Sequence, residues 1–206
     1  MTLPTTPSDV DLLRQMMTGN EDAFTQLFQR RQASVYRFAL QMSGSRTLAE
    51  DVTQEVFIVL IRDGGRYDPD RGSLSAYLYG IARNHVLRKL EQDRPFVQLA
   101  DRGDGDEFIP EAMIADGNPL GELTRNEKIQ ELRDLILSMP PRYREVVVLC
   151  DLHEMSYGEA ASVMGCAVGT IRSRLHRARA LLLEKLRAAR DRNEDSQDVK
   201  PARCFA

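Results

Sequence analysis

The sequence is poor in the residues that build disulfide-linked and catalytic proteins. Its 206 residues include three cysteines, three histidines and no tryptophan. An odd number of cysteines without paired spacing is not the pattern of a disulfide framework or of a zinc site, whose ligands recur at short fixed intervals. The scattered histidines offer no constellation of acid, base and nucleophile. We therefore expect no enzyme activity, no cofactor and no metal site.

Long apolar segments and strand patterns are also missing. No window approaches the roughly 18 consecutive apolar residues of a membrane span. The N-terminus lacks the basic start and the apolar run of a signal peptide. We therefore expect a soluble, cytoplasmic protein without membrane insertion. Apolar residues recur three and four positions apart and do not alternate with polar ones, which predicts an all-α fold.

Turn residues and charge divide the chain into four parts. We expect a first helical domain over residues 1–92, whose last two helices are separated by a Gly- and Pro-rich loop. A flexible acidic linker over 93–122 follows, because eleven Asp or Glu stand against four Arg or Lys between Glu91 and Glu131. A second helical domain covers 123–190, including a helix over 142–152. The polar tail over 191–206 is expected to be disordered.

The second domain carries the pattern of a helix-turn-helix. Ala161 is small enough for close helix packing, Gly165 turns the corner, and Ile171 anchors a second helix in the core. A purely structural helical hairpin is the alternative. From Arg172 to Arg190 there are seven Arg or Lys against one Glu, which suits a helix that lies beside phosphates. The candidates for base contacts are Arg172, Ser173, His176 and Arg177, and the candidates for backbone contacts are Thr170, Arg174 and Arg179.

Five segments in order and register carry a family resemblance. They are Ala49–Phe57, Tyr67–Ser73, Leu78–Asn84, Met139–Val146 and Val168–Arg179. With them the chain resembles the extracytoplasmic-function (ECF, group IV) class of bacterial RNA polymerase sigma factors over roughly residues 20–185. Many members carry tryptophan in the fourth helix where this chain has Tyr77. The resemblance implies an initiation factor that binds core RNA polymerase and directs promoter recognition, melting and transcription initiation.

The resemblance also implies roles for residues of the first domain. This domain looks like sigma region 2, in which Asp51, Gln54 and Glu55 would dock on the clamp helices of the largest polymerase subunit. Plain solvation of the same polar face is the alternative. Stacking and polar side chains would capture the melted −10 element. The candidates for this role are Arg66, Tyr67, Arg71, Tyr77, Arg83, Asn84 and Arg88.

The second domain looks like region 4, which recognises the −35 element and contacts the polymerase flap. The acidic linker would thread toward the channels of the polymerase, or would serve only as a tether. Members of the class are commonly held inactive by an anti-sigma factor, and we expect such a partner here. A stand-alone helix-turn-helix regulator is the competing function. It would leave the match around Asp51 and the loop at Asp68–Asp70 without explanation.

Overall fold

The computed structural model describes residues 7–92 and 125–197. The predicted linker over 93–122 lies outside the described residues, as does the last part of the predicted tail. Every regular element in the two described ranges is helical, which confirms the all-α class. No helix in those ranges is long and apolar enough to cross a membrane.

The first domain contains four α-helices and two short 3₁₀ turns. They are α1 (Asp9–Met17), α2 (Glu21–Ser43), α3 (Arg46–Asp63), η1 (Gly64–Arg66), η2 (Pro69–Arg71) and α4 (Leu74–Gln92). The helices begin at residues whose side chains accept hydrogen bonds from the first turn: Ser8 for α1, Asn20 for α2 and Ser45 for α3. Gly44 ends α2 with a left-handed φ of 72°, as glycine readily does.

The second domain contains the helix-turn-helix. Its elements are α5 (Arg125–Leu137), α6 (Pro141–Val147), the π turn η3 (Val148–Leu152), α7 (Tyr157–Met164) and α8 (Val168–Gln197). Ser156 and Glu159 form a capping box at the start of α7. Gly165 ends α7 with a φ of 63°, and α8 begins three residues later.

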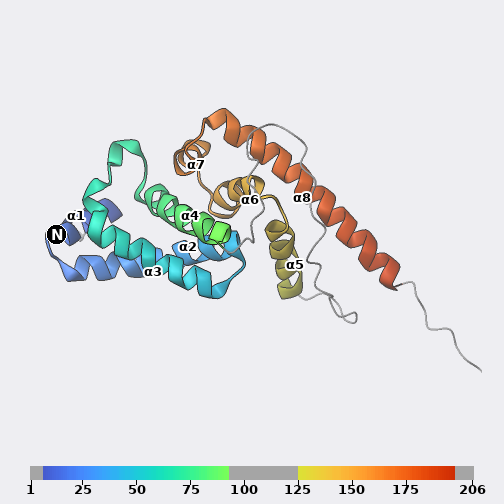
Figure 1. Cartoon of the computed structure of the whole chain (residues 1–206), viewed down its shortest axis with the longest axis horizontal. Coiled ribbons are helices and arrows are strands. Elements are labelled where there is room, and N and C mark those ends of the chain that lie inside the picture. The colour runs from blue at the N-terminus through green and yellow to red at the C-terminus, as the bar shows by residue number, and fades with distance from the viewer. Residues whose placement is uncertain (1–6, 93–124, 198–206) are drawn as a thin grey trace, which may run out of the picture.

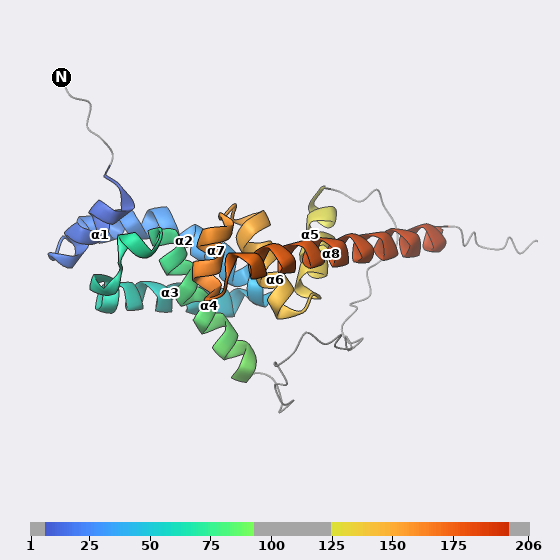
Figure 2. The ribbon, with the colours of Figure 1, turned by 90° about the horizontal axis from the view of Figure 1, so that it is seen from above.

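The two domains pack directly against each other. Figures 1 and 2 show α6 and α7 beside α4, with α8 extending away from the first domain. Helix α4 contacts α7, and α2 contacts α5, α6 and η3. The cores of both domains join into one cluster of buried residues, from Leu27 and Phe38 in α2 to Ile171 and Leu175 in α8.

Two local predictions differ from the structure. The helix expected over 142–152 is α-helical only to Val147, and the backbone N–H of His153 then reaches the carbonyl of Val148 in a π turn. Helix α8 continues to Gln197, past the expected end at 190, because no glycine or proline interrupts this polar stretch.

Candidate nucleic-acid interface

The predicted reading helix is α8, and its apolar face anchors it. Ile171, which the sequence predicted as an anchor in the core, is fully buried, and Leu175 and Ala178 on the same face are fully or almost fully buried. Ala161 of α7 is also buried, which allows the close approach of the two helices. The four base-contact candidates, Arg172, Ser173, His176 and Arg177, are all exposed on α8. A helix that lies in the major groove requires this arrangement, in which the apolar face is buried and the cationic face is exposed.

The backbone-contact candidates flank this face, and they differ in exposure and in ion pairing. Thr170 and Arg174 are half-buried. Arg179 is exposed but makes a bidentate ion pair with Asp151 of η3, at 2.5 and 3.1 Å. Hydrogen bonding to Asp151 raises the pKa of Arg179 further. Arg179 therefore has to leave a carboxylate before it can hold a phosphate.

A cavity of about 350 Å³ collects most of the side chains predicted to capture melted DNA. It lies between the η1–η2 loop, α4 and α7. Five of the seven candidates line it, and two do not, namely Arg83 and Arg88. The five are Arg66, Tyr67, Arg71, Tyr77 and Asn84. The cavity therefore joins aromatic faces, two guanidinium groups and an amide, which are the groups that hold an unstacked base.

The two tyrosines of this cavity are held by the loop itself. The hydroxyl of Tyr67 donates to the carbonyl of Gly72 at 3.0 Å. The ring centroids of Tyr67 and Tyr77 lie 5.5 Å apart. Burial raises the pKa of both phenols, so both hydroxyls stay protonated near neutral pH. Tyr77 thus supplies an aromatic platform with an added hydrogen-bond donor.

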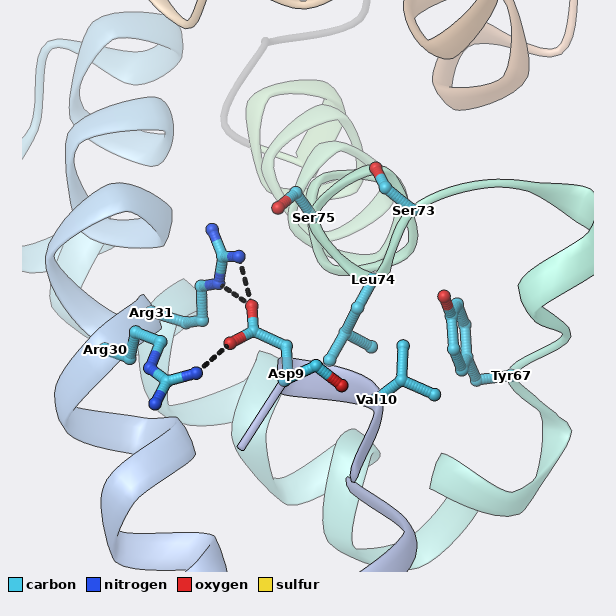
Figure 3. Close-up of a pocket in the computed structure, with 9 residues that line it drawn as sticks. Asp9, Val10, Arg30, Arg31, Tyr67, Ser73, Leu74 and Ser75 are labelled. Atoms are coloured by element: carbon cyan, nitrogen blue, oxygen red, sulfur yellow. Dashed lines mark hydrogen bonds and ion pairs between the residues drawn. The ribbon is translucent and has the colours of Figure 1, made fainter. Parts of the chain in front are cut away.

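A second cavity, of about 470 Å³, lies on the other side of Tyr67 and joins α1 to α2 and α4 (Figure 3). Asp9 occupies one wall, where its carboxylate pairs with Arg30 at 2.7 Å and also with Arg31. Figure 3 shows both guanidinium groups turned toward this single carboxylate. The ion pairs tie α1 to α2 and so support the loop that carries Tyr67.

The two remaining candidates on α4 are engaged elsewhere. Arg83 pairs with Glu145 of α6 through its Nε and Nη2 atoms, at 3.1 and 3.0 Å. Arg88 lies 3.0 Å from Nδ1 of His85, one turn back on the same helix. His85 is half-buried, and burial followed by the charge of Arg88 lowers its pKa. Arg88 is exposed, whereas Arg83 is largely covered by the second domain.

The predicted docking face on α3 is polar at one end and apolar at the other. Asp51, Gln54 and Glu55 are exposed, as predicted. Ile58 and Ile61 continue the same helical face and are 51% and 54% exposed. Sequence reasoning missed them because isoleucines in an amphipathic helix are normally assigned to the core. Their signal was the spacing from Asp51, since seven and ten residues return close to the same side.

Cys150 and His153 lie within the fold and do not form a metal site. Among the described residues, no group of three or more His, Cys, Asp or Glu side chains is arranged to hold a metal ion. His153 engages both ring nitrogens, with the Tyr79 hydroxyl at 2.9 Å and the Gln41 side-chain oxygen at 2.8 Å. Cys150 is half-buried, and burial and the charge of Asp151 raise its pKa.

Comparison with known proteins agrees with this division. Residues 27–95 match the family Sigma-70 region 2, and residues 129–182 match the family Sigma-70, region 4. The chain is similar to the ECF RNA polymerase sigma factor SigW of Bacillus subtilis. The two are 30% identical over 178 residues, which cover 85% of this chain and 95% of SigW.

Solved structures give the same result for the fold. CnrH, solved in complex with the cytosolic domain of CnrY, aligns with a TM-score of 0.65 and 27% identity over 87% of this chain and 97% of that one. The sigma factor RpoE of Bartonella quintana, solved with the anti-sigma factor NepR, aligns with a TM-score of 0.60 and 24% identity, over 80% of this chain and 96% of that one. Region 2 and region 4 matched in order, together with a full-length relative, leave the stand-alone regulator without support. The chain belongs to the ECF sigma factors of RNA polymerase.

Proposed function

We propose that this sigma factor divides promoter recognition between its two domains. The exposed face of α8, with Arg172, Ser173, His176 and Arg177, reads the −35 element in the major groove. Thr170, Arg174 and Arg179 hold the adjacent phosphates. The cavity between the η1–η2 loop and α4 captures the melted −10 element, with Tyr67 and Tyr77 as stacking surfaces. Arg83 and Arg88 follow along α4 and extend this surface toward the DNA backbone.

Core polymerase docks on the exposed face of α3. Asp51, Gln54 and Glu55 supply its charged and polar part, and Ile58 and Ile61 supply the apolar part that sequence reasoning missed. An apolar centre beside a charged rim is the usual composition of a specific protein interface. The flap of the polymerase receives the second domain. The sigma factor contributes binding and no chemistry of its own, and it acts in the cytoplasm with the polymerase.

The single observation that carries this function is the construction of α8. Ile171, Leu175 and Ala178 are buried in the helix-turn-helix core, while the four candidate readers face solvent. A Gly-turned corner with a left-handed φ of 63° sets the angle between the two helices. A helix that only covered a core would also have a polar outer face, but from Arg172 to Leu183 this helix carries four arginines and no Asp or Glu.

Transcription in vitro from a randomised promoter library tests the proposal. Purified bacterial core polymerase is assayed with and without the chain, and initiated transcripts are sequenced. We expect initiation that requires the chain and enrichment of a motif with two separated blocks. The variant Ile58→Glu with Ile61→Glu should lose core binding, whereas the exposed control Glu184→Gln should not. Specific duplex binding without any initiation would contradict the proposed role.

An anti-sigma factor is the proposed regulator. RpoE of Bartonella quintana was solved with such a partner, and this chain shares that fold. A regulator of this kind would have to cover the α3 face or the DNA-binding surfaces of both domains. Co-purification of the tagged chain from its own cells, followed by loss of initiation on adding the captured protein, tests this. A captured protein that leaves initiation unchanged would contradict it.

A further inference from the structure

Helix α1 lies behind the loop that carries Tyr67. It precedes the segment that matches Sigma-70 region 2, which begins at residue 27. Figure 1 shows α1 at the end of the first domain, beside the η1–η2 loop and away from α8. It packs on α2 and η1, and its Leu12 and Leu13 are buried. Arg66 and Arg71 on the loop are exposed. The loop therefore has one side that faces solvent and another side that α1 contacts.

Ion pairs fix the start of α1 on α2. The Asp9 carboxylate pairs with Arg30 at 2.7 Å and also with Arg31. Arg30 donates in addition to the carbonyl of Pro7 at 3.0 Å. The Asp9 side chain is 11% exposed, so water competes only weakly for these bonds. Hydrogen bonds between two charged groups are stronger than neutral ones, and two such partners on one carboxylate set the position at which α1 begins.

The end of α1 packs directly on the backbone of the loop. An ideal Cβ at the buried Gly64 would lie 3.2 Å from Cδ1 of Leu13 and 3.2 Å from Sδ of Met17. A Cβ at Gly65 would lie 3.5 Å from Cε of Met17. The missing side chain at Gly64 allows this close approach. Met17 is 45% exposed, so it contacts the loop without being part of the core.

Tyr67 connects α1 to the cavity proposed to capture the melted −10 element. It lines the cavity beside α1 together with Val10 and Leu74 (Figure 3). It also lines the cavity of about 350 Å³ between the loop, α4 and α7, in which Tyr77 is the second aromatic residue. A shift of α1 therefore reaches the stacking surface through a residue that both cavities share.

The two ends of the loop are supported by different helices. Its first 3₁₀ turn is closed by a local bond, from the N–H of Tyr67 to the Gly64 carbonyl at 3.1 Å. Such a bond closes the turn but does not fix it relative to the helices. The far end is held by Ser73, which caps α4 and donates to Glu159 of α7 at 2.7 Å. At the Gly64 end, α1 supplies the contact that positions the turn.

We propose that α1 is a positioning element for −10 capture, with Asp9 and Met17 as its positioning residues. By supporting η1 and Tyr67, α1 keeps the cavity in the arrangement that accepts an unstacked base before the DNA arrives. Asp9 and Met17 act through Tyr67 and do not contact DNA. Loosening α1 lowers the fraction of chains whose cavity is ready, and leaves core binding and −35 recognition intact. This inference rests on the proposed role of the cavity in −10 capture.

Amide hydrogen exchange of the full chain tests the contact between α1 and the loop. Mass spectrometry measures it over residues 64–72, and circular dichroism checks that each variant is folded. We expect Asp9→Asn and Met17→Ala each to raise exchange over these residues and to leave exchange over α3 and α8 unchanged. Asp22→Asn makes the same chemical change at an exposed position of α2 and should alter nothing. Unchanged exchange over 64–72 in Asp9→Asn and Met17→Ala, or an equal rise across α3, would overturn the positioning role.

Initiation with core polymerase from two forms of one promoter tests the effect on capture. One form is a duplex, and in the other mismatched bases hold open the −10 block selected in the library experiment. On the duplex we expect Asp9→Asn and Met17→Ala to initiate about tenfold less than the natural chain, because a cavity that is ready a tenth of the time binds a tenth as tightly. On the pre-melted form they should match the natural chain, since capture no longer has to offset the cost of melting. A defect that persists on the pre-melted promoter, or weaker core binding, would overturn the proposal.

The two proposals fail separately. If the chain drives initiation with core polymerase but neither variant changes exchange over residues 64–72, the promoter function stands and the role of α1 is wrong. If both variants raise exchange there but initiation never depends on the chain, α1 supports the loop and the promoter function is wrong.

Discussion

The two surfaces proposed to meet DNA differ in how far the rest of the molecule engages them. On α8, all four candidate readers are exposed, and α8 points away from the first domain (Figure 1). On α4 and its preceding loop, the cavity is walled by α7 and Arg83 is paired with Glu145. Duplex DNA is the target of the first surface, and unpaired bases are the target of the second. On the second surface Arg66, Arg71 and Asn84 remain exposed, so the other elements engage only its tyrosines and Arg83.

The largest expected effect is a loss of base discrimination by α8, the more open of the two surfaces. Arg172→Ala or Arg177→Ala should each cost about 1–3 kcal/mol of discrimination at one base pair, because each removes a candidate bidentate contact. Affinity of the holoenzyme for single-base variants of the −35 block measures this loss. Arg187→Ala is the control, since Arg187 is exposed on α8 almost three turns beyond Arg177. Equal loss of specificity in the control would contradict the assignment.

The next effect is a pH dependence of the contact between α4 and the second domain. Burial, with a smaller contribution from Arg37, lowers the pKa of His153 from 6.5 to about 4. While the domains are packed together the ring of His153 stays neutral, whereas in separated domains it would take up a proton below pH 6.5. The contact between the domains should therefore be strongest above pH 6.5. It should weaken by up to about 1.4 kcal/mol per pH unit as the pH falls toward 4.

The radius of gyration measured between pH 7 and pH 4.5 tests this expectation. Glu145 works in the opposite direction, because its raised pKa lets the packed domains take up a proton more readily than separated domains would. The variant His153→Gln separates the two, since it retains a donor and an acceptor but does not titrate. If the natural chain and His153→Gln open over the same pH range, His153 is not the responsible group.

A smaller effect, on stability, concerns the turn that leads into the reading helix α8. Gly165 has a φ of 63°, and a Cβ there would meet nothing within 4 Å. Gly165→Ala should therefore cost about 1 kcal/mol of unfolding free energy through backbone strain alone. Gly169→Ala, inside α8 and also without a neighbour within 4 Å, should instead stabilise by roughly 0.5–1 kcal/mol. Thermal unfolding of both variants checks the signs, and destabilisation by both would contradict the strain argument.

The smallest effect concerns Arg179, whose guanidinium is held by an ion pair on the open side. Arg179 and Asp151 are 57% and 29% exposed, so their ion pair should contribute less than about 1 kcal/mol to stability. Asp151→Asn should leave the melting temperature almost unchanged while freeing Arg179 for a phosphate. We expect tighter binding to any duplex with unaltered sequence preference. Weaker duplex binding by Asp151→Asn would show that the carboxylate positions Arg179 for DNA.

Features that depend on neighbours in the chain could be predicted from the sequence. The buried face of α8, the corner at Gly165 and the ends of α2 and α4 all follow from spacing and turn residues within a few positions. The grouping of Tyr67 with Tyr77 was also accessible, because a short loop joins them. These local rules placed five of the seven melting candidates around one cavity.

The contacts between the domains could not be predicted in this way. Glu145 lies 62 positions from Arg83, and His153 lies 74 from Tyr79. Within its own helix Glu145 reads as an ordinary polar residue, and nothing in the periodicity shows that it is 4% exposed. The sequence does not separate a packing role for Tyr79 from a contact with DNA, whereas its burial against Phe38 and His153 assigns it to packing.

The π turn at Val148–Leu152 determines the direction in which the chain after it is rotated about the helix axis. The N–H of His153 bonds to the carbonyl five residues earlier, so this turn holds one residue more than an α-helical turn would. Deleting a single residue there would let the helix return to α geometry and rotate the following chain by about 100°. His153 would then face away from Tyr79, and α7 would leave the approach angle that seats Glu159 on Ser73. The length of one turn, as much as the charge of any side chain, thus determines whether the two domains can fit together.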